Sequence, residues 1–371
     1  MKKVFVAILA LALLAGAVSC KKDDPTPADD PTEEGGGNQD SDTEPSYQEG
    51  IYNPWRHITC LQNTGTNQQW SWNSGTPRQL TAITDQTSGE SYTFTYKNSG
   101  LLATATHSED GNSYLYTYSY DDGELDRYTI KKANTTMAEG EVSHNTSGKI
   151  TSASYDNFHP ELCLSMIGYD MDPANVTLTS SSYNVAYTWV GDNVSQVSES
   201  GSFAGKVAMS ELIDYFGDEL TSGISSYANI VMLFLQEMGD EQVDYTVSVT
   251  RSTNYTYDAQ RNPFRGFWGE GLMLNDYVLS ANNCTASTAV GNGTFNSGIT
   301  ISLPEECPSW VPSTYQFLWS VIRALLNNKE IPINRTIPLN KTLSYTYQYN
   351  DKGFPTSITC GDVRTAITYA E

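Results

Sequence analysis

The sequence predicts a mainly β protein, built as a curved antiparallel sheet or partial barrel of serial hairpins that encloses two short helical insertions. The first observation is strict alternation: between residues 114 and 120, tyrosines alternate with Leu, Thr and Ser, so one kind of side chain occupies one face of a strand. The second is that glycines able to adopt positive φ follow such stretches, as at Gly100, Gly123 and Gly148. The third is composition, because 24 Tyr and 28 Gly among 371 residues suit strands and turns.

Residues 1–20 resemble a bacterial lipoprotein signal peptide. Lys2 and Lys3 precede an uncharged apolar run that ends at Ala17-Val18-Ser19-Cys20. In such signals the cysteine is acylated and becomes the mature N-terminus, although Ala17 stands where leucine is usual. Buried acyl chains contribute about 0.8 kcal/mol per CH₂, so Cys20 is predicted to hold the protein on a membrane. The alternative is an ordinary secretory peptide in which Cys20 occurs by chance.

Residues 21–50 are predicted to form a disordered acidic tether. This segment holds ten acidic residues, a Gly-Gly-Gly run and four prolines, with almost nothing to bury. Its start, Lys21-Lys22-Asp23-Asp24, is similar to the export signal of lipoproteins displayed on the surface of Bacteroidetes-type cells. We therefore expect lipid anchoring in the outer membrane, facing the cell exterior, with the periplasmic face as the alternative.

Charge and metal-ligand patterns exclude several classes of partner. The formal charge of −22 argues against nucleic acid, because carboxylates and phosphates repel each other. We expect no cofactor and no metal: the four His are scattered, there is no C-x-x-C, and Asp40-x-Asp42-x-Glu44 lacks the remaining ligands of a calcium loop. A bridge between Cys60 and Cys360 would join the first strand to the last, and unpaired thiols are the alternative. The cysteines after Cys20 are Cys60, Cys163, Cys284, Cys307 and Cys360.

Residues 51–371 are predicted to form the β-hairpin domain. Strands are expected in alternating stretches around residues 70–72, 92–96, 114–130, 150–154, 187–189, 255–257, 345–358 and 365–369. The face opposite the aromatic residues carries Thr and Ser, as at Thr93, Thr117 and Thr346. A barrel that spans lipid would carry apolar residues outward, so we expect the aromatic face to point inward and the hydroxyl face to contact water.

Two helical insertions are expected, near residues 207–239 and 312–328. In the first, Ser210 suits an N-cap and Glu211 the first turn, and residues 228–238 are apolar nearly all round before Gly239. The second carries apolar residues from Tyr315 to Leu326. A helix that is apolar on most sides has to be enclosed, so we expect the curved sheet to wrap around both.

Two motifs carry a resemblance to a known family. Tyr257-Asp258 is followed by Asn262-Pro263-Phe264-Arg265-Gly266, and a Leu-Ser-x-Asn-Asn stretch follows at residues 279–283. With the repeated Tyr-x-Tyr hairpins, these motifs resemble a family of Bacteroidetes lipoproteins of unknown function with a porin-like fold, over most of residues 80–371. The resemblance implies a fold and an outer-membrane address, and it supplies no catalytic or binding residues.

The favoured function is a surface-exposed binding protein for a glycan, a peptide or an outer-membrane protein partner. Four tryptophans are the candidate ligand-stacking residues, although Trp70 and Trp72 also fit an ordinary core strand. They are Trp55, Trp70, Trp72 and Trp268.

Two other functions remain open. A secreted glycoside hydrolase or peptidase is the first, but no G-x-S-x-G or H-E-x-x-H is present, and Glu305, Glu306, Glu211 and Asp214 are only generic carboxylates. The sequence therefore predicts no catalytic residue. A structural subunit without a small ligand is the second.

Overall fold

The computed structural model describes residues 46–160, 162, 168, 172–222, 232, 235–236, 241–267, 276–309, 311 and 313–370. The predicted signal peptide with Cys20, and nearly all of the tether, lie outside these residues. The mainly β, antiparallel prediction is confirmed, since 17 strands form one sheet within the described part of the chain. The strands that precede the first long hairpin are β1 (Ile58–Gln62), β2 (Asn67–Trp72), β3 (Leu80–Asp85), β4 (Ser91–Tyr96), β5 (Leu102–Glu109), β6 (Asn112–Asp121), β7 (Glu124–Lys132), β8 (Thr135–His144) and β9 (Ile150–Asp156).

The remaining strands include four long ones. They are β10 (Val176–Val190), β11 (Asn193–Ala208), β12 (Gln242–Arg261) and β13 (Asn282–Thr300), followed by β14 (Glu330–Pro338), β15 (Lys341–Tyr349), β16 (Pro355–Cys360) and β17 (Val363–Tyr369). Short helical elements interrupt them: η2 (Pro173–Asn175), α2 (Met209–Ser222), α4 (Asp276–Leu279), α5 (Ser313–Gln316) and α6 (Trp319–Leu326).

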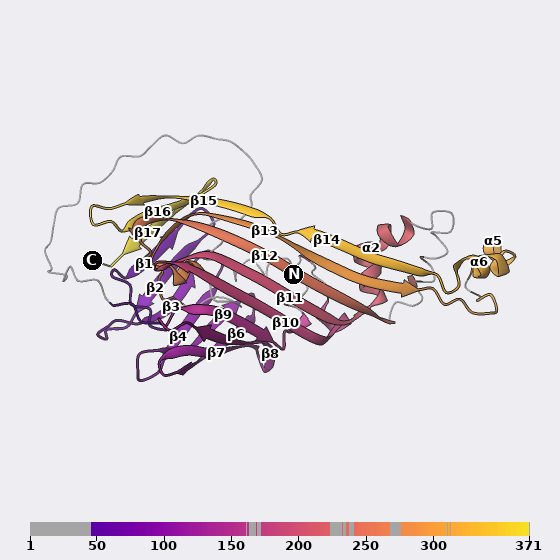
Figure 1. Cartoon of the computed structure of the whole chain (residues 1–371), viewed down its shortest axis with the longest axis horizontal. Helices are drawn as coiled ribbons and strands as arrows, with labels where there is room; N and C mark the ends of the chain where they lie inside the picture. The colour runs from indigo at the N-terminus through magenta and orange to yellow at the C-terminus, as the bar shows by residue number, and fades with distance from the viewer. Residues whose placement is uncertain are drawn as a thin grey trace.

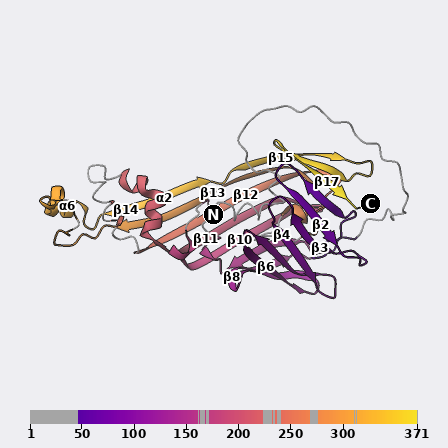
Figure 2. The same ribbon diagram turned by 180° about the vertical axis from the view of Figure 1, so that it is seen from behind.

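The sheet closes into a barrel. Consecutive strands pair antiparallel from β1 to β13, and β17 pairs back onto β1, with Leu61 opposite Ile367. β14 and β15 both pair with the same edge of β13, so they share one place in the ring and the barrel has 16 strand positions. Figures 1 and 2 show the wall of this barrel from opposite sides. Closure agrees with the porin-like fold that the family resemblance implies.

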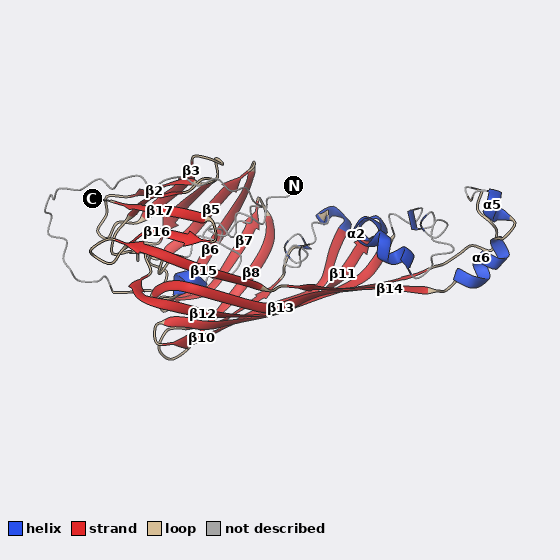
Figure 3. Cartoon of the chain, turned by 90° about the horizontal axis from the view of Figure 1, so that it is seen from above, coloured by secondary structure: helices blue, strands red, loops and turns tan. Residues whose placement is uncertain are grey.

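The long strands project beyond the barrel. β10 pairs with β9 only between Tyr183 and Ala186, so the half of β10 before Tyr183 continues past the barrel wall. The halves of β11, β12 and β13 that lie beside it, and β14, continue with it. We call this part of the sheet the extension (residues 176–182, 202–208, 242–248, 294–300 and 330–336). Figure 3 shows it leaving the barrel as a narrow sheet, with α2 against it and α5 and α6 at its far end.

The aromatic residues point inward, as predicted. Tyr114, Tyr116 and Tyr118 are buried, whereas Thr117 and Ser119 between them are exposed. Inside, rings from β7, β9 and β10 contact one another edge to face: the ring centroids of Tyr128 and Tyr155 lie 5.6 Å apart across Gly140 of β8, and those of Tyr155 and Tyr183 lie 6.0 Å apart. The inner face is therefore a continuous aromatic layer.

Glycines make room for these rings. A Cβ on Gly201 would lie 2.6 Å from the Tyr183 ring, and one on Gly140 would lie 2.9 Å from Tyr128. Real Cβ atoms essentially never approach another heavy atom closer than 3.0 Å, so both glycines are required by packing.

The two helical insertions lie differently from the expectation. α2 buries Met209, Leu212 and Phe216 against one face of the extension, where the Phe216 ring stacks on Phe295 at 5.0 Å. Most of residues 228–238 lies outside the described residues. The expectation that the sheet encloses the second insertion is wrong, because α6 lies beyond the barrel at the tip of the extension (Figure 3).

Helix α6 exposes one apolar face. It buries Trp319, Ile322 and Leu326 within its own loop, while Phe317 before it is 75% exposed and Leu325 is 54% exposed. A short cluster of neighbouring residues covers one side of this apolar helix, so the helix does not need to be enclosed by the barrel.

Of the two alternatives for Cys60 and Cys360, a bridge or unpaired thiols, the structure shows unpaired thiols. Both are free thiols, as is Cys307, and Cys163 lies outside the described residues. Strand β17 lies between β1 and β16. In the sheet register, Cys60 lies opposite Thr368, whereas Cys360 lies opposite Val363. Two strand spacings of about 4.8 Å each already exceed the reach of a disulfide. No helix among the described residues is both long and apolar enough to cross a membrane.

Candidate functional site

The N-terminal segment, residues 46–57, crosses the end of the barrel opposite the extension. One backbone group and one side chain of this segment are hydrogen-bonded to strands: Leu102 N–H donates to the Gly50 carbonyl at 2.9 Å, and Leu125 N–H donates to the Glu49 side-chain carboxylate at 3.0 Å. Gly50 adopts a φ of 71°, and a Cβ there would lie 2.5 Å from the Tyr120 ring. This segment is therefore held in one path before β1 begins.

The described parts of the β12–β13 loop are residues 262–267 and 276–281, and Pro263 and Gly266 in the first part contact that segment. Asn262 organises its start, since its side-chain oxygen accepts from Phe264 N–H at 3.0 Å and its amide donates to the Ser280 carbonyl at 3.1 Å. Gly266 has a φ of 87° and lies against the backbone of Ile51. The Asn-Pro-Phe-Arg-Gly motif is thus a turn, and its hydrogen bonds fix the position of this part of the loop.

That turn separates apolar from charged side chains. Phe264 and Phe267 are buried in the barrel, where Phe267 contacts Tyr52 at 5.1 Å and Trp70 at 5.6 Å between ring centroids. Arg265 lies between them in sequence and points the other way, with its guanidinium 4.1 Å from the centroid of the Tyr47 ring. The described part of this loop therefore contributes aromatic side chains to the core of the barrel.

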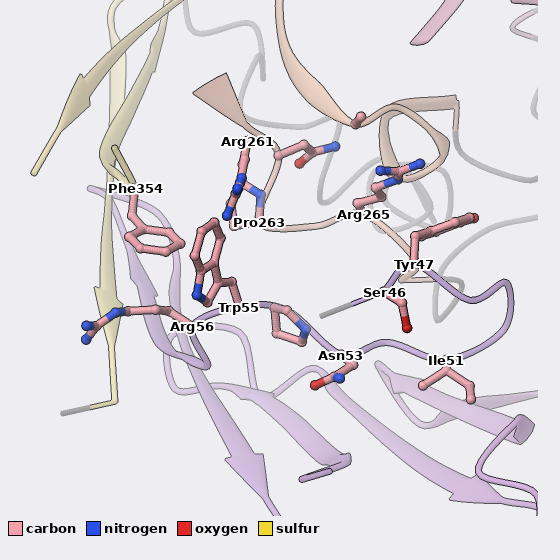
Figure 4. Close-up of a pocket in the computed structure, with 13 residues that line it drawn as sticks. Ser46, Tyr47, Ile51, Asn53, Trp55, Arg56, Arg261, Pro263, Arg265 and Phe354 are labelled. Atoms are coloured by element: carbon pink, nitrogen blue, oxygen red, sulfur yellow. The ribbon is translucent and has the colours of Figure 1, made fainter. Parts of the chain in front are cut away.

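The Trp55 pocket lies between the N-terminal segment, the β12–β13 loop and the β15–β16 turn (Figure 4). The Arg261 guanidinium lies 3.3 Å from the centroid of the Trp55 ring, and Phe354 meets that indole edge to face at 5.5 Å. Arg56 lies 5.7 Å from the Phe354 centroid. The room for water in the pocket is about 60 Å³, and Trp55 is only half-buried beside it.

A larger hollow adjoins this pocket. We call it the Trp189 hollow; it has room for about 440 Å³ of water and shares Tyr47 and Arg265 with the Trp55 pocket. Lys149 donates to Asp192 at 2.8 Å and lies 5.4 Å from the Trp189 ring, whose indole N–H donates to the Ile150 carbonyl. The Trp55 pocket and the Trp189 hollow together form what we call the barrel-end site.

Charges in the Trp189 hollow are of both signs. Its carboxylates include Glu49 and Asp192. The hydrogen bond and charge of Lys149 lower the pKa of Asp192, so this carboxylate stays ionised. Glu49 accepts from His144 Nε2 at 2.9 Å. Burial lowers the pKa of His144, but the hydrogen bond and charge of Glu49, together with the charges of Glu124 and Asp126, outweigh burial, so the net effect is a raised pKa.

The four predicted stacking residues separate into different environments. Trp55 lies in the pocket, whereas Trp70 is 4% exposed and belongs to the core, so the core interpretation of Trp70 is correct. Trp72 is half-buried, with its indole N–H donating to the Ile58 carbonyl at 2.7 Å and its ring packed on His57. Trp268 lies outside the described residues. The structure therefore brings one of the four to a pocket.

Sequence reasoning missed the arginines and the second tryptophan of the site. Arg261 and Arg265 flank the Asn-Pro-Phe motif. Their position among aromatic residues in the sequence could have identified them as candidate site residues. Trp189 was assigned only to a strand. No group of three or more His, Cys, Asp or Glu side chains close enough to hold a metal ion occurs among the described residues.

Comparisons with known proteins do not identify the chain. No protein-family model matches it, and no curated protein matches it. A chain of the solved structure described as "Crystal Structure of TcdB2-TccC3-Cdc42" is similar over 82% of this chain and 16% of that chain, with 9% sequence identity and a TM-score of 0.14. A TM-score this low carries no argument about fold or function.

Proposed function

We propose that the protein is a surface lipoprotein that binds a glycan at the barrel-end site. The observation that carries the proposal is the half-buried Trp55 indole, which borders an open pocket and is held by Arg261 and Phe354 from two other parts of the chain. Binding pockets combine aromatic surface with a few well-placed polar groups, and this pocket has both. Because its walls come from packed segments, the pocket is pre-formed, which lowers the entropy cost of binding.

The proposed address rests on the N-terminal sequence. Cys20 in its lipoprotein-like context would supply the anchor, and the acidic segment after it would place the barrel away from the lipid surface. Membership of the Bacteroidetes lipoprotein family with a porin-like fold is part of the same proposal. The Thr- and Ser-bearing outer face of the strands supports a barrel surrounded by water.

The hydrolase alternative finds less support in the site. No carboxylate of the described residues lines the Trp55 pocket. A general acid needs a raised pKa, whereas the pKa of Asp192 in the neighbouring hollow is lowered. The structural-subunit alternative makes no use of Trp55. Removing the Trp55 side chain therefore distinguishes the proposal, in which glycan binding is lost, from the two alternatives.

A glycan array tests the proposal. The full-length protein, purified in detergent, is expected to bind a subset of glycans, and Trp55→Ala is expected to weaken that binding at least tenfold. Phe317→Ala is the matched control, because Phe317 is an exposed aromatic residue between α5 and α6, which Figure 3 shows at the far end of the molecule. Binding that survives Trp55→Ala, or binding to none of the glycans, would contradict the proposal.

A further inference from the structure

We propose that the exposed apolar face of α6 inserts into the surface of a lipid bilayer, so that the tip of the extension contacts a membrane and the barrel-end site faces away from it. This inference goes beyond glycan binding and does not depend on it. It follows from an apolar stripe on α6, from the contacts that fix this helix, and from the reach of the chain before residue 46.

One side of α6, together with the two residues before it, carries only apolar side chains, and we call this surface the tip stripe. Its members have the one-, three- and four-residue spacings that place side chains on one face of a helix. All are exposed, Phe317 to 75% and Val321 to 49%. Arg323, the single charged residue of α6, lies on another side, where it donates to the Leu303 carbonyl at 3.4 Å and lies 3.7 Å from Glu305. The members of the tip stripe are Phe317, Leu318, Val321, Ala324 and Leu325.

The helix cannot turn this stripe inward, because its opposite side is already packed. The buried side chains of α6 belong to the hydrophobic core cluster, and the indole N–H of Trp319 among them donates to the Pro304 carbonyl at 3.3 Å. After the helix, the side-chain oxygen of Asn327 accepts from Leu303 N–H at 2.9 Å. The tip stripe is therefore a fixed part of the protein surface.

The position of α6 suits contact with a flat surface. Figures 1 and 3 show α5 and α6 beyond the strands of the extension, at the end of the molecule far from the barrel. A membrane can meet this tip without touching the barrel. Amphipathic helices that lie in the lipid interface insert Phe and Leu side chains to a depth of about 5–10 Å, and the tip stripe offers these residue types with no charge among them.

A second copy of the chain fits the stripe less well. On typical side-chain areas, the tip stripe exposes roughly 400 Å². Each partner in a stable protein–protein interface buries about 800 Å², so two stripes packed together would supply about half of the usual area. Insertion into lipid has no such threshold, because its strength grows with the apolar area that is buried.

The proposed lipid anchor can bring a bilayer to the tip. The described chain begins at Ser46 near the barrel end, so residues 21–45 have to cover the length of the molecule. β12 runs from the extension to the barrel end with 20 residues, or about 66 Å, whereas 25 residues of chain reach at most about 85 Å. The difference of roughly 20 Å exceeds the length of α6, which is about 12 Å. Cys20 can therefore lie in the membrane that the tip stripe contacts.

Vesicle flotation tests the inference. The chain from residue 20 onward contains every described residue, and Cys20→Ser removes its acylation site, so binding to lipid has to come from the folded protein. With neutral vesicles of phosphatidylcholine and phosphatidylethanolamine, the protein is expected to float, and equally so between about 0.05 and 0.5 M salt, since the stripe is uncharged. Val321→Asp with Leu325→Asp is expected to weaken binding roughly tenfold or more. The matched control is Val190→Asp with Val290→Asp, which adds the same charge at exposed valines outside α6 and is expected to keep binding.

A second measurement does not depend on loss of binding. Vesicles whose acyl chains carry bromine quench the fluorescence of a tryptophan that enters them. We expect stronger quenching of Leu325→Trp than of the protein without this change, and no added quenching of Val190→Trp. A folding defect in the aspartate variants therefore cannot obscure the result.

Four outcomes would overturn the inference. The first is no binding to the vesicles, and the second is equal loss of binding in the stripe variant and its control. The third is binding that falls as salt rises, because it would show an electrostatic contact elsewhere on the surface. The fourth is self-association in sedimentation that the stripe variant abolishes, in a protein that binds no vesicles, because the partner would then be a second copy.

Discussion

Replacement of Gly205 by alanine is expected to destabilise the protein more than its small size suggests. Gly205 lies in β11 opposite Leu178, next to a register shift in β10. A Cβ at this position would lie 1.8 Å from the Thr177 carbonyl oxygen, whereas real Cβ atoms essentially never come closer than 3.0 Å to such an atom. The β10 backbone would therefore have to move by about 1.2 Å, and it cannot rotate away as a side chain would.

The expected cost combines overpacking with lost hydrogen bonds. Overpacking a close contact typically costs 1–3 kcal/mol, and each broken ladder hydrogen bond adds roughly 1 kcal/mol. The Thr177 carbonyl also accepts from the Tyr245 hydroxyl at 3.4 Å, and this contact would be displaced. We expect a loss of about 3 kcal/mol in the free energy of unfolding for Gly205→Ala.

Urea unfolding followed by tryptophan fluorescence measures this loss. The matched control is Gly65→Ala, because a Cβ on Gly65 would meet only the Asn63 side chain at 3.8 Å and the residue has no positive φ. The control is expected to stay within about 0.5 kcal/mol of the unaltered protein. If the two variants were equally stable, the close approach of β10 and β11 at Gly205 would be wrong.

Three further predictions concern the core, the barrel end and the thiols. Trp70→Ala is expected to cost about 3–5 kcal/mol in urea unfolding because this indole is buried, and a loss as small as that of the half-exposed Trp55→Ala would contradict its place in the core. The carboxylates of Glu49, Glu124 and Asp126 raise the pKa of His144 against the effect of burial, so the stability it contributes is full below about pH 6.5 and is lost as pH rises through the raised pKa. Urea midpoints across this range should fall for the unaltered protein and stay flatter for His144→Asn. Iodoacetamide added to the unfolded, unreduced protein should label Cys60 fully by mass spectrometry, and labelling only after reduction would show a disulfide.

Much of the fold could be predicted because strand alternation and turn glycines are local signals. The buried Tyr114 and exposed Thr117 lie where the pattern placed them, and Gly123 and Gly148 adopt positive φ at the turns. The contents of the barrel could not be predicted in the same way. We expected only apolar helices in the interior, but Phe264 and Phe267 of a loop also belong to the core. A loop has no periodicity that would reveal its position in advance.

The candidate site depends on contacts between distant parts of the chain. Tyr47 meets Arg265, and Trp55 meets Arg261, across more than 200 residues of sequence, so spacing alone could not bring them together. Composition did identify Trp55 as a surface candidate, but it could not distinguish it from Trp70. That distinction arises because Trp70 alternates into the core within β2, whereas Trp55 precedes the sheet.

The seam between β1 and β17 has a consequence for how the chain reaches this state. Thr59 donates to the Thr368 carbonyl across 309 residues, so the ring can be completed only after nearly every strand has been synthesised. Pairings between such distant segments form slowly, because the entropy of the intervening chain has to be lost first. Until then one edge of β1 is unpaired and open to other molecules. A chain truncated before residue 363 would lack β17, so we expect it to aggregate through this edge.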